Sequence, residues 1–252
     1  MKAAERQLRI RQMLESKDFI DLETLCRELD TSESSIRRDL DALEEQNVLK
    51  RVYGGALVRS AANGGGFDYE ISGKHFQDEK ARIAKLAAGL ISDGQTVVLD
   101  GGSTAAAVAR ELATRSLHIV TNSLPIAEAL QDARSIELTL TGGYLDPRIR
   151  VMLGPFCEQM LSAVRADVLV MGIGSITESG FSNNNTLVVG SERKMIEISS
   201  KVIIVADHTK FGRGAMIPVA PLEVADIVLS DRSLAAEYQE MLKAKGVQVL
   251  LA

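Results

Sequence analysis

The chain has 252 residues, of which 46% are hydrophobic and 25% charged, so it has enough apolar side chains for two globular domains. Its formal net charge of −5 argues against a strongly basic protein that holds nucleic acid by bulk attraction. The sequence has neither a signal-peptide pattern nor an uninterrupted apolar run of about 18 residues, so we expect a cytoplasmic location and no membrane partner.

Three short amphipathic helices are predicted near the N-terminus, because apolar residues recur every three or four positions. The apolar stripes are Ile10, Met13 and Leu14 in the first helix, Leu22, Leu25, Cys26 and Leu29 in the second, and Ile36, Leu40 and Leu43 in the third. Asp21 is a suitable N-cap for the second helix and Thr31 or Ser32 for the third, since these side chains accept hydrogen bonds from first-turn amides. The short connection between the second and third helices is typical of a helix-turn-helix.

A β-hairpin is predicted directly after the third helix. Residues 48–53 have strand composition, and Gly54 with Gly55 can supply the positive φ angles of a tight turn before a second strand at 56–58. This hairpin would form the wing of a winged helix-turn-helix. The third helix has Ser34, Arg37 and Arg38 on its polar face, where the arginines could reach a DNA groove. On spacing alone, a small helical bundle with a solvated charged face is the structural alternative.

The charge of this N-terminal region is nearly balanced. Residues 1–59 contain 11 Lys and Arg against 12 Asp and Glu, a net charge of −1. Phosphate neutralisation supplies much of the affinity of DNA-binding proteins, so binding here would depend on cations gathered on one face. It would also favour a dimer that reads two half-sites.

A stretch of small residues at 59–66 has no apolar period and predicts a flexible linker. We therefore expect a DNA-binding domain at 1–58, a linker at 59–73 and a second domain at 74–252. In the second domain, helical and strand patterns alternate, and continuous apolar strands such as Val202–Val205 are typical of a parallel sheet covered on both faces. The predicted fold class is α/β, doubly wound, with a mostly parallel sheet.

The elements expected in the second domain follow from these patterns. The helices are predicted at 81–91, 104–112, 125–130, 156–164, 192–199 and 234–244. The strands are predicted at 96–99, 118–120, 137–140, 168–171, 202–205, 227–230 and 247–251.

The loop that follows the first of these strands has the composition of an anion site. Ligands of such sheets bind beyond the carboxyl ends of the strands, and Asp100 begins this loop. Gly101 and Gly102 would let backbone amides approach a phosphate, Ser103 and Thr104 add hydroxyl donors, and the following helix adds a positive N-terminus. The loop lacks the Gly-Lys-Ser/Thr of a Walker A motif. A tight turn with a hydroxyl cap is the structural alternative.

Polar or glycine-rich loops follow four further strands, and together they could surround one ligand. The candidates in these loops are Asn122, Gly142, Gly143, Gly172, Asp207 and Lys210. Each also has a structural explanation: a helix cap for Asn122, turns for the glycines, and a surface pair for Asp207 with Lys210.

Cofactor and metal sites are not expected. Gly172 and Gly174 begin a dinucleotide fingerprint that the sequence does not complete. No ligand cluster surrounds His208, so we expect no metal. Cys26 and Cys157 are far apart in the sequence, and we expect both to be buried, reduced thiols.

The motifs Ser-Ile-Arg-Arg-Asp-Leu at 35–40 and Leu-Lys-Arg-Val-Tyr-Gly-Gly-Ala at 49–56 resemble the N-terminal signature of the DeoR family of bacterial transcriptional regulators. The resemblance implies operator DNA as a partner. It places on the recognition helix and the wing, respectively, the two sets Ser34, Ser35, Arg37 and Arg38, and Lys50, Arg51 and Tyr53.

The order of the loops, through residues 206–212, also resembles the effector domain of these regulators, which shares a fold with ribose-5-phosphate isomerases. This implies a phosphorylated sugar as effector. Its phosphate would lie on Gly101, Gly102, Ser103 and Thr104, and its sugar near Asp100, Asn122, Asp207 and Lys210. One position departs from the family pattern: relatives often have a lysine where this chain has Glu192, with Lys194 nearby. Neither residue is assigned a ligand contact.

Two functions therefore compete. The first is a repressor of a carbohydrate-utilisation operon, acting as a homodimer or homotetramer and controlled by a phosphorylated sugar. The second is a sugar-phosphate isomerase-like enzyme with an accessory DNA-binding domain, which needs a carboxylate base and an electrophile. Asp100, Asp207 and Lys210 could supply these groups, but the chain lacks the Asp-Gly-Ala-Asp stretch of isomerases. We therefore favour binding without catalysis.

Overall fold

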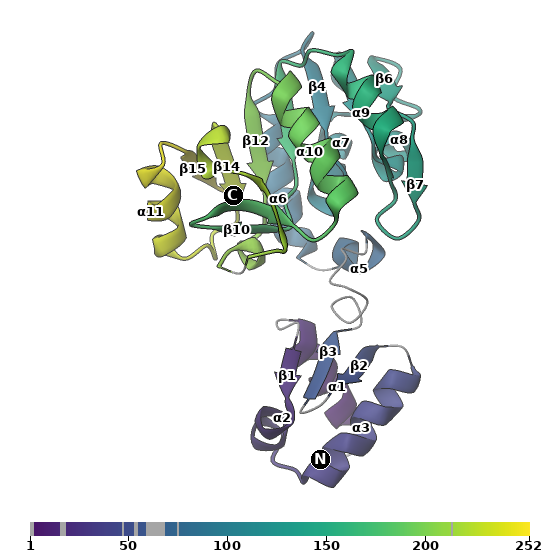
Figure 1. Ribbon diagram of the computed structural model, residues 1–252, viewed down its shortest axis with the longest axis vertical. Helices are drawn as coiled ribbons and strands as arrows, with labels where there is room; N and C mark the ends of the chain where they lie inside the picture. The colour runs from purple at the N-terminus through teal and green to yellow at the C-terminus, as the bar shows by residue number, and fades with distance from the viewer. Residues whose placement is uncertain are drawn as a thin grey trace. The chain divides into compact units, whose positions relative to one another are not determined.

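The computed structural model describes residues 3–15, 19–46, 48–52, 55–58, 69–74, 76–212 and 214–252. The chain divides into two compact units, Met1–Gly66 and Phe67–Ala252 (Figure 1). Within the described ranges, no helix is both long enough and apolar enough to span a membrane.

The described part of the first unit contains three helices and a small antiparallel sheet, in agreement with the prediction. The helices are α1 (Ala3–Glu15), α2 (Leu22–Glu28) and α3 (Glu33–Glu45), and the strands are β1 (Phe19–Asp21), β2 (Leu49–Val52) and β3 (Gly55–Val58). The sheet order is β1-β3-β2. Strand β1 was not predicted, because three residues are too few to show an alternating pattern. The sheet is therefore a three-stranded wing.

One of the two glycines predicted to form the hairpin turn belongs to a strand. Gly55 pairs with Val52 of β2 and with Asp21 of β1, so it is part of β3. Gly54, the other predicted turn residue, lies outside the described part of the chain.

The predicted apolar stripes form the core of this unit. Its buried members include Ile10, Leu14, Leu25, Leu29, Ile36, Leu40 and Leu43. Cys26 only packs partly buried against this core, so the prediction of a buried thiol was wrong there, whereas Cys157 is buried; both are free. Asp21 caps α2, accepting a hydrogen bond from the Thr24 amide at 2.7 Å.

Ser32 occupies the N-cap position of α3, but its side chain does not cap the helix. Its hydroxyl instead lies 3.2 Å from that of Ser34 and 3.1 Å from that of Ser35. The backbone carbonyl of Ser32 accepts from the amides of Ser35 and Ile36. Ser32 was correctly predicted as the N-cap residue, but the predicted hydrogen bond from a first-turn amide to its hydroxyl is not formed.

The second unit is built on a seven-stranded parallel sheet, as predicted. Its strands are β4 (Thr96–Leu99), β5 (Leu117–Thr121), β6 (Ile136–Leu140), β9 (Val168–Met171), β12 (Val202–Val205), β14 (Ile227–Ser230) and β15 (Gln248–Leu251). They lie in the order β15-β14-β12-β9-β4-β5-β6, and every neighbouring pair is parallel. The chain adds strands in one direction from β4 to β6 and in the other from β9 to β15. The order therefore reverses between β4 and β9, where ligands of such sheets bind.

Helices cover both faces of the sheet. They are α5 (Tyr69–Lys74), α6 (Gln77–Ala88), α7 (Ser103–Leu112), α8 (Leu124–Leu130), α9 (Pro155–Ser162), α10 (Thr186–Ile198) and α11 (Ala236–Ala244), with short 3-10 helices η1 (His208–Lys210) and η2 (Leu222–Val224). Val97 and Leu99 pack with α6, α7 and α8 in one core, whereas Val98 packs with α9, α10 and α11 in another. Figure 1 shows α9 and α10 in front of the sheet.

Several short elements were missed. They are the hairpin β7 (Tyr144–Asp146) and β8 (Val151–Leu153), and a small antiparallel sheet of β10 (Ser175–Thr177), β11 (Gly180–Asn183) and β13 (Ile217–Ala220). Helix α10 also begins six residues before the predicted start at 192, because Asn185 caps it by accepting from the amides of Leu187 and Val188. Three-residue and four-residue strands give little periodic signal.

Residues 69–73, expected to be part of the linker, belong to α5 (Tyr69–Lys74) and pack within the second unit. The Tyr69 amide donates to the Arg148 carbonyl at 3.1 Å, and its side chain packs against the core that contains α6 and α7. Within 59–73, residues 59–68 lie outside the described part of the chain.

An ion pair joins α1 to α3 in the first unit. Asp39 lies on α3 and is only 3% exposed. Its Oδ2 atom is 2.6 Å from Arg6 Nε, and its Oδ1 accepts from Gln7 Nε2 at 3.2 Å. The pair therefore sets the position of α3 against α1.

We expect Asp39→Ala to lower the stability of the first unit by about 3 kcal/mol, because it leaves the largely buried Arg6 guanidinium without its carboxylate. Hydrogen exchange of the α1 and α3 amides measures the loss. The control is Glu45→Ala at an exposed position of the same helix, which should change stability by less than about 0.5 kcal/mol. Equal protection in both variants would show that the ion pair is not structural.

Candidate functional site

The predicted DNA-binding residues of α3 lie opposite its apolar face. Ser34, Arg37 and Arg38 are exposed and Ser35 is half-buried. Arg37 pairs with Glu33 one turn earlier, and Arg38 Nε donates to the Ser34 carbonyl at 3.3 Å. The arginines are thus on the surface but bonded within the helix, so a contact with DNA would exchange these local bonds for others.

The remaining DNA-binding candidates belong to the hairpin. Lys50 and Arg51 lie in β2, between the α3 helix and the hairpin turn, and the structure describes their backbone only. Tyr53 lies outside the described residues.

Two of the loops at the reversal of strand order lie close together. Gly101 follows β4 and Gly172 follows β9; a Cβ atom added to Gly172 would lie 3.7 Å from the Gly101 carbonyl oxygen. A Cβ atom added to Gly101 would lie 3.8 Å from Asn122 Oδ1 and only 2.1 Å from Val151 Cγ1. Gly101 therefore leaves room for the β7–β8 hairpin, and the site includes the ends of three strands.

Helix α7 presents its N-terminus in this loop. Its N-cap is Gly102, with a φ of 140°, and glycine has no side chain to accept from first-turn amides. Ser103 is the first helical residue, and its hydroxyl lies 3.0 Å from that of Ser72 on α5. Thr104 is buried beside them. Amides of a glycine-capped helix start are available to an anion.

A buried lysine lies next to this helix start. Lys80 on α6 is 5% exposed, and its ammonium donates to the Ser72 carbonyl. Burial lowers the pKa of Lys80, the charge of Asp207 opposes this, and the charge of Lys210 lowers the pKa further. Lys80 is therefore bonded to Ser72, which contacts the start of α7, and its charge interacts with that of Asp207 after β12. Sequence reasoning missed it, because a lysine within a helical pattern has no distinguishing motif.

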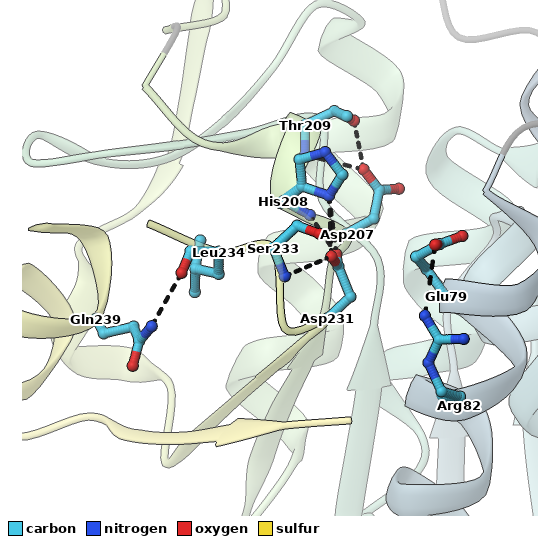
Figure 2. A network of polar contacts seen from close by, with 9 residues as sticks. All are labelled: Glu79, Arg82, Asp207, His208, Thr209, Asp231, Ser233, Leu234 and Gln239. Carbon is cyan, nitrogen blue, oxygen red and sulfur yellow. Dashed lines mark hydrogen bonds and ion pairs between the residues drawn. The ribbon is translucent and has the colours of Figure 1, made fainter. Parts of the chain in front are cut away.

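Asp207 is buried and not part of a surface pair. It accepts hydrogen bonds from the amide of Thr209 at 3.1 Å and from its hydroxyl. The loop is held further by Asp231, which accepts from the His208 amide at 2.8 Å and lies 3.0 Å from His208 Nδ1 (Figure 2). The described residues contain no group of three or more His, Cys, Asp or Glu suited to a metal ion.

Gly142 and Gly143 have φ angles of 72° and 117°, which favour glycine. A Cβ atom on Gly143 would lie 2.6 Å from the Leu153 carbonyl oxygen and 3.2 Å from the Cys157 Cβ. Gly143 therefore allows the chain after β6 to approach β8 and α9, whereas a Cβ atom on Gly142 would meet nothing within 4 Å. The positive φ angles of both glycines agree with the turn explanation.

Two carboxyl groups are buried at the site. Asp100, at the end of β4, is 4% exposed, and Glu192, on α10, is 1% exposed. Burial raises the pKa of Glu192 to about 8, and the charge of Asp100 raises it as well. Burial raises the pKa of Asp100 to about 7, against the effect of a hydrogen bond from the Gly101 amide. Lys194 points elsewhere and pairs with Glu197 at 2.6 Å.

The comparisons with known proteins agree with this organisation. The chain matches the model of the DeoR-like helix-turn-helix domain over residues 6–62 and that of the DeoR C terminal sensor domain over residues 75–232. The HTH-type transcriptional repressor GlcR of Bacillus subtilis is 33% identical, over 98% of this chain and 95% of its own length. The glycerol-3-phosphate regulon repressor of Escherichia coli is 33% identical over the whole of both chains.

Among solved structures, a ribose 5-phosphate isomerase of Methanocaldococcus jannaschii is 19% identical with a TM-score of 0.41. The match covers 54% of this chain and 55% of that one.

We expect Glu192→Gln to change how stability depends on pH. The carboxyl group of Glu192 has an ordinary pKa of 4.5 and a folded-state pKa of about 8. Between these values the folded chain keeps a proton that the unfolded chain loses, so the Glu192 contribution to stability falls as pH rises. Glutamine does not titrate. Urea unfolding at pH 5 and pH 8 should therefore show the stability difference moving in favour of the variant at pH 8.

The matched control is Glu197→Gln on an exposed part of the same helix, which should follow the wild-type pH dependence. A Glu192→Gln variant whose stability stays parallel to that of the wild type would contradict the raised pKa.

Proposed function

Because the chain belongs to the DeoR family of transcriptional regulators, we propose that it represses a carbohydrate-utilisation operon under the control of a phosphorylated sugar. The observation that carries the proposal is the match of both units, one to a DNA-binding domain and the other to a sensor domain. The relatives are named as repressors, and one of them is named for a regulon of a phosphorylated compound, glycerol 3-phosphate.

The first unit binds operator DNA in this proposal. Helix α3 is the recognition helix, with Ser34, Ser35, Arg37 and Arg38 facing bases and phosphates. The hairpin is the wing, with Lys50, Arg51 and Tyr53 on the adjacent backbone. The exposure of the α3 arginines supports this. The net charge of −1 over residues 1–59 favours a homodimer or homotetramer, because two half-sites strengthen a weak single contact.

The second unit binds the effector phosphate at the start of α7. Gly101, Gly102, Ser103 and Thr104 supply backbone amides and hydroxyls, and the N-terminus of the helix favours an anion. Lys80 adds a cation beside Ser72, which contacts Ser103, and Lys210 adds a second charge close to Lys80.

The sugar moiety lies at the ends of the neighbouring strands in this proposal. Asp100 and Asn122 are buried there, and Asp207 follows β12. Gly172 keeps the loop after β9 close to Gly101. Gly143 acts indirectly, because it lets the chain approach the hairpin that packs on Gly101, and Gly142 supplies the positive φ of the turn before it.

Effector binding controls repression through linkage. A ligand changes operator affinity only if the ligand-bound and operator-bound proteins prefer different arrangements. The protein binds its ligand without converting it, and it acts in the cytoplasm, where the operator is. Turnover of pentose or hexose phosphates at ordinary enzyme rates would contradict this proposal in favour of the isomerase alternative.

We expect Arg37→Ala to reduce operator affinity by about 1–3 kcal/mol if Arg37 reads a base, with little effect on random DNA. Lys50→Ala should weaken binding to both DNAs and reduce the salt dependence by about one counterion, since a phosphate contact is lost. Fluorescence anisotropy at several salt concentrations measures both. Equal losses on operator and random DNA for Arg37→Ala would exclude base reading.

We expect Lys80→Met to weaken sugar-phosphate binding by about tenfold or more, because a hydrogen-bonded charge is removed from the phosphate. Operator affinity without effector should stay unchanged. Ligand-dependent thermal shifts measure binding, since a ligand that binds only the folded state raises the melting temperature. Lys85→Met, at an exposed position of the same helix, is the control, and equal shifts in the two variants would remove Lys80 from the site.

A further inference from the structure

The buried side of the candidate site is rich in hydrogen-bond acceptors. Glu192 Oε2 and Asn122 Oδ1 are both buried, and neither has a partner among the described residues. Asp100 lies close enough for its charge to act on Glu192. Buried polar atoms are rarely left without partners, so these acceptors point to a ligand that brings donors.

The orientation of Glu192 is fixed from its other side. Asn183 Nδ2 donates to Glu192 Oε1 at 2.9 Å. The amide of Asn183 cannot turn over freely, because its Oδ1 accepts from the Asn184 amide at 2.8 Å. Gly174 leaves the space for this arrangement, since a Cβ atom there would lie 3.2 Å from Asn183 Oδ1. One oxygen of Glu192 is therefore held, and the other remains for a second partner.

The charges near Glu192 oppose an anionic group on the ligand. The charge of Asp100 raises the pKa of Glu192, and the charge of Arg193 lowers it with a smaller effect. The Arg193 guanidinium itself donates to the Val219 and Pro218 carbonyls. The buried Lys80 lies instead beside Ser72 and the start of α7. The site is thus acidic on one side and basic on the other.

We propose that Glu192 determines effector specificity: when a hydroxyl or ammonium group of the phosphorylated ligand binds, the carboxyl group releases its proton to solvent and its Oε2 accepts the ligand's hydrogen bond, and ligands with an anionic group there are excluded. The inference rests on the proposed function, because the phosphate must lie at the start of α7. A hydroxyl and an ammonium share the required chemistry, a donor hydrogen, and differ in charge.

The Glu192→Gln variant tests the specificity role of Glu192 without changing the size of the side chain. Since Asn183 donates to the position of Oε1, the glutamine carbonyl must lie there and its NH2 group takes the position of Oε2. The variant therefore keeps donors at this position, whereas the wild-type carboxyl group can lose its proton and become an acceptor. Glu192→Lys reverses the charge, and Glu197→Gln, exposed on the same helix, is the matched control.

The probes are inorganic phosphate, glucose 6-phosphate, glucosamine 6-phosphate and 6-phosphogluconate, measured by calorimetry on the full chain. We expect the wild type to bind glucose 6-phosphate or glucosamine 6-phosphate more tightly than it binds inorganic phosphate or 6-phosphogluconate. Glu192→Gln should lose about tenfold of that affinity with phosphate binding unchanged, and Glu192→Lys should favour phosphogluconate. The glucose and glucosamine arms distinguish a hydroxyl from an ammonium.

Undiminished sugar-phosphate affinity in Glu192→Gln would overturn the inference, as would a wild type that binds phosphate but gains nothing from either sugar. Failure of phosphate and all three sugar phosphates to bind would contradict the proposed function instead. If Glu192→Lys does not fold, the isosteric Glu192→Gln variant still decides the question.

Discussion

The central strands of the parallel sheet are buried on both faces, and buried polar residues follow them at the carboxyl edge. Val97, Val98 and Leu99 pack alternately into the two cores, and the next residue, Asp100, is a buried carboxylic acid. Asn122 and Asp207 follow their strands in the same way. Because the strand order reverses between β4 and β9, these loops lie where ligands of such sheets bind. The candidate site is thus a consequence of how the sheet is covered.

Burying a charged group costs free energy unless the charge is paired or hydrogen-bonded. The second unit buries its charged groups in two separate places. Lys80, with Lys210 near it, makes the start of α7 positive, whereas Asp100 and Glu192 make the other side acidic when ionised. Strongly shifted pKa values are typical of functional sites more than of groups kept for stability. In the function that we propose, this separation would orient a bound sugar phosphate, with its phosphate at the helix and its donors toward the carboxyl groups.

In the first unit, neighbouring residues of the motif at 35–40 lie in different environments. Within Ser-Ile-Arg-Arg-Asp-Leu, Ile36 and Leu40 form the core and Arg37 and Arg38 lie on the surface, whereas Asp39 is buried against Arg6. Because the charge of this unit is nearly balanced, DNA binding depends on keeping acidic side chains away from the arginines. The acid that positions the helix is buried and does not lie on the surface that we propose to face DNA, so its charge is kept away from the arginines there.

The sequence by itself determined the elements that have strong local patterns: the three N-terminal helices, the long buried strands, and the loop from Asp100 to Thr104, because periodicity and turn chemistry are local properties. Only the tertiary structure decided which loops meet. Lys80 and Glu192 lie on helices far from Asp100 in sequence, and a helical pattern does not reveal which face meets a strand end. Short strands such as β7 and β10 were missed for the same reason, because pairing with a distant segment, and not local periodicity, makes them strands.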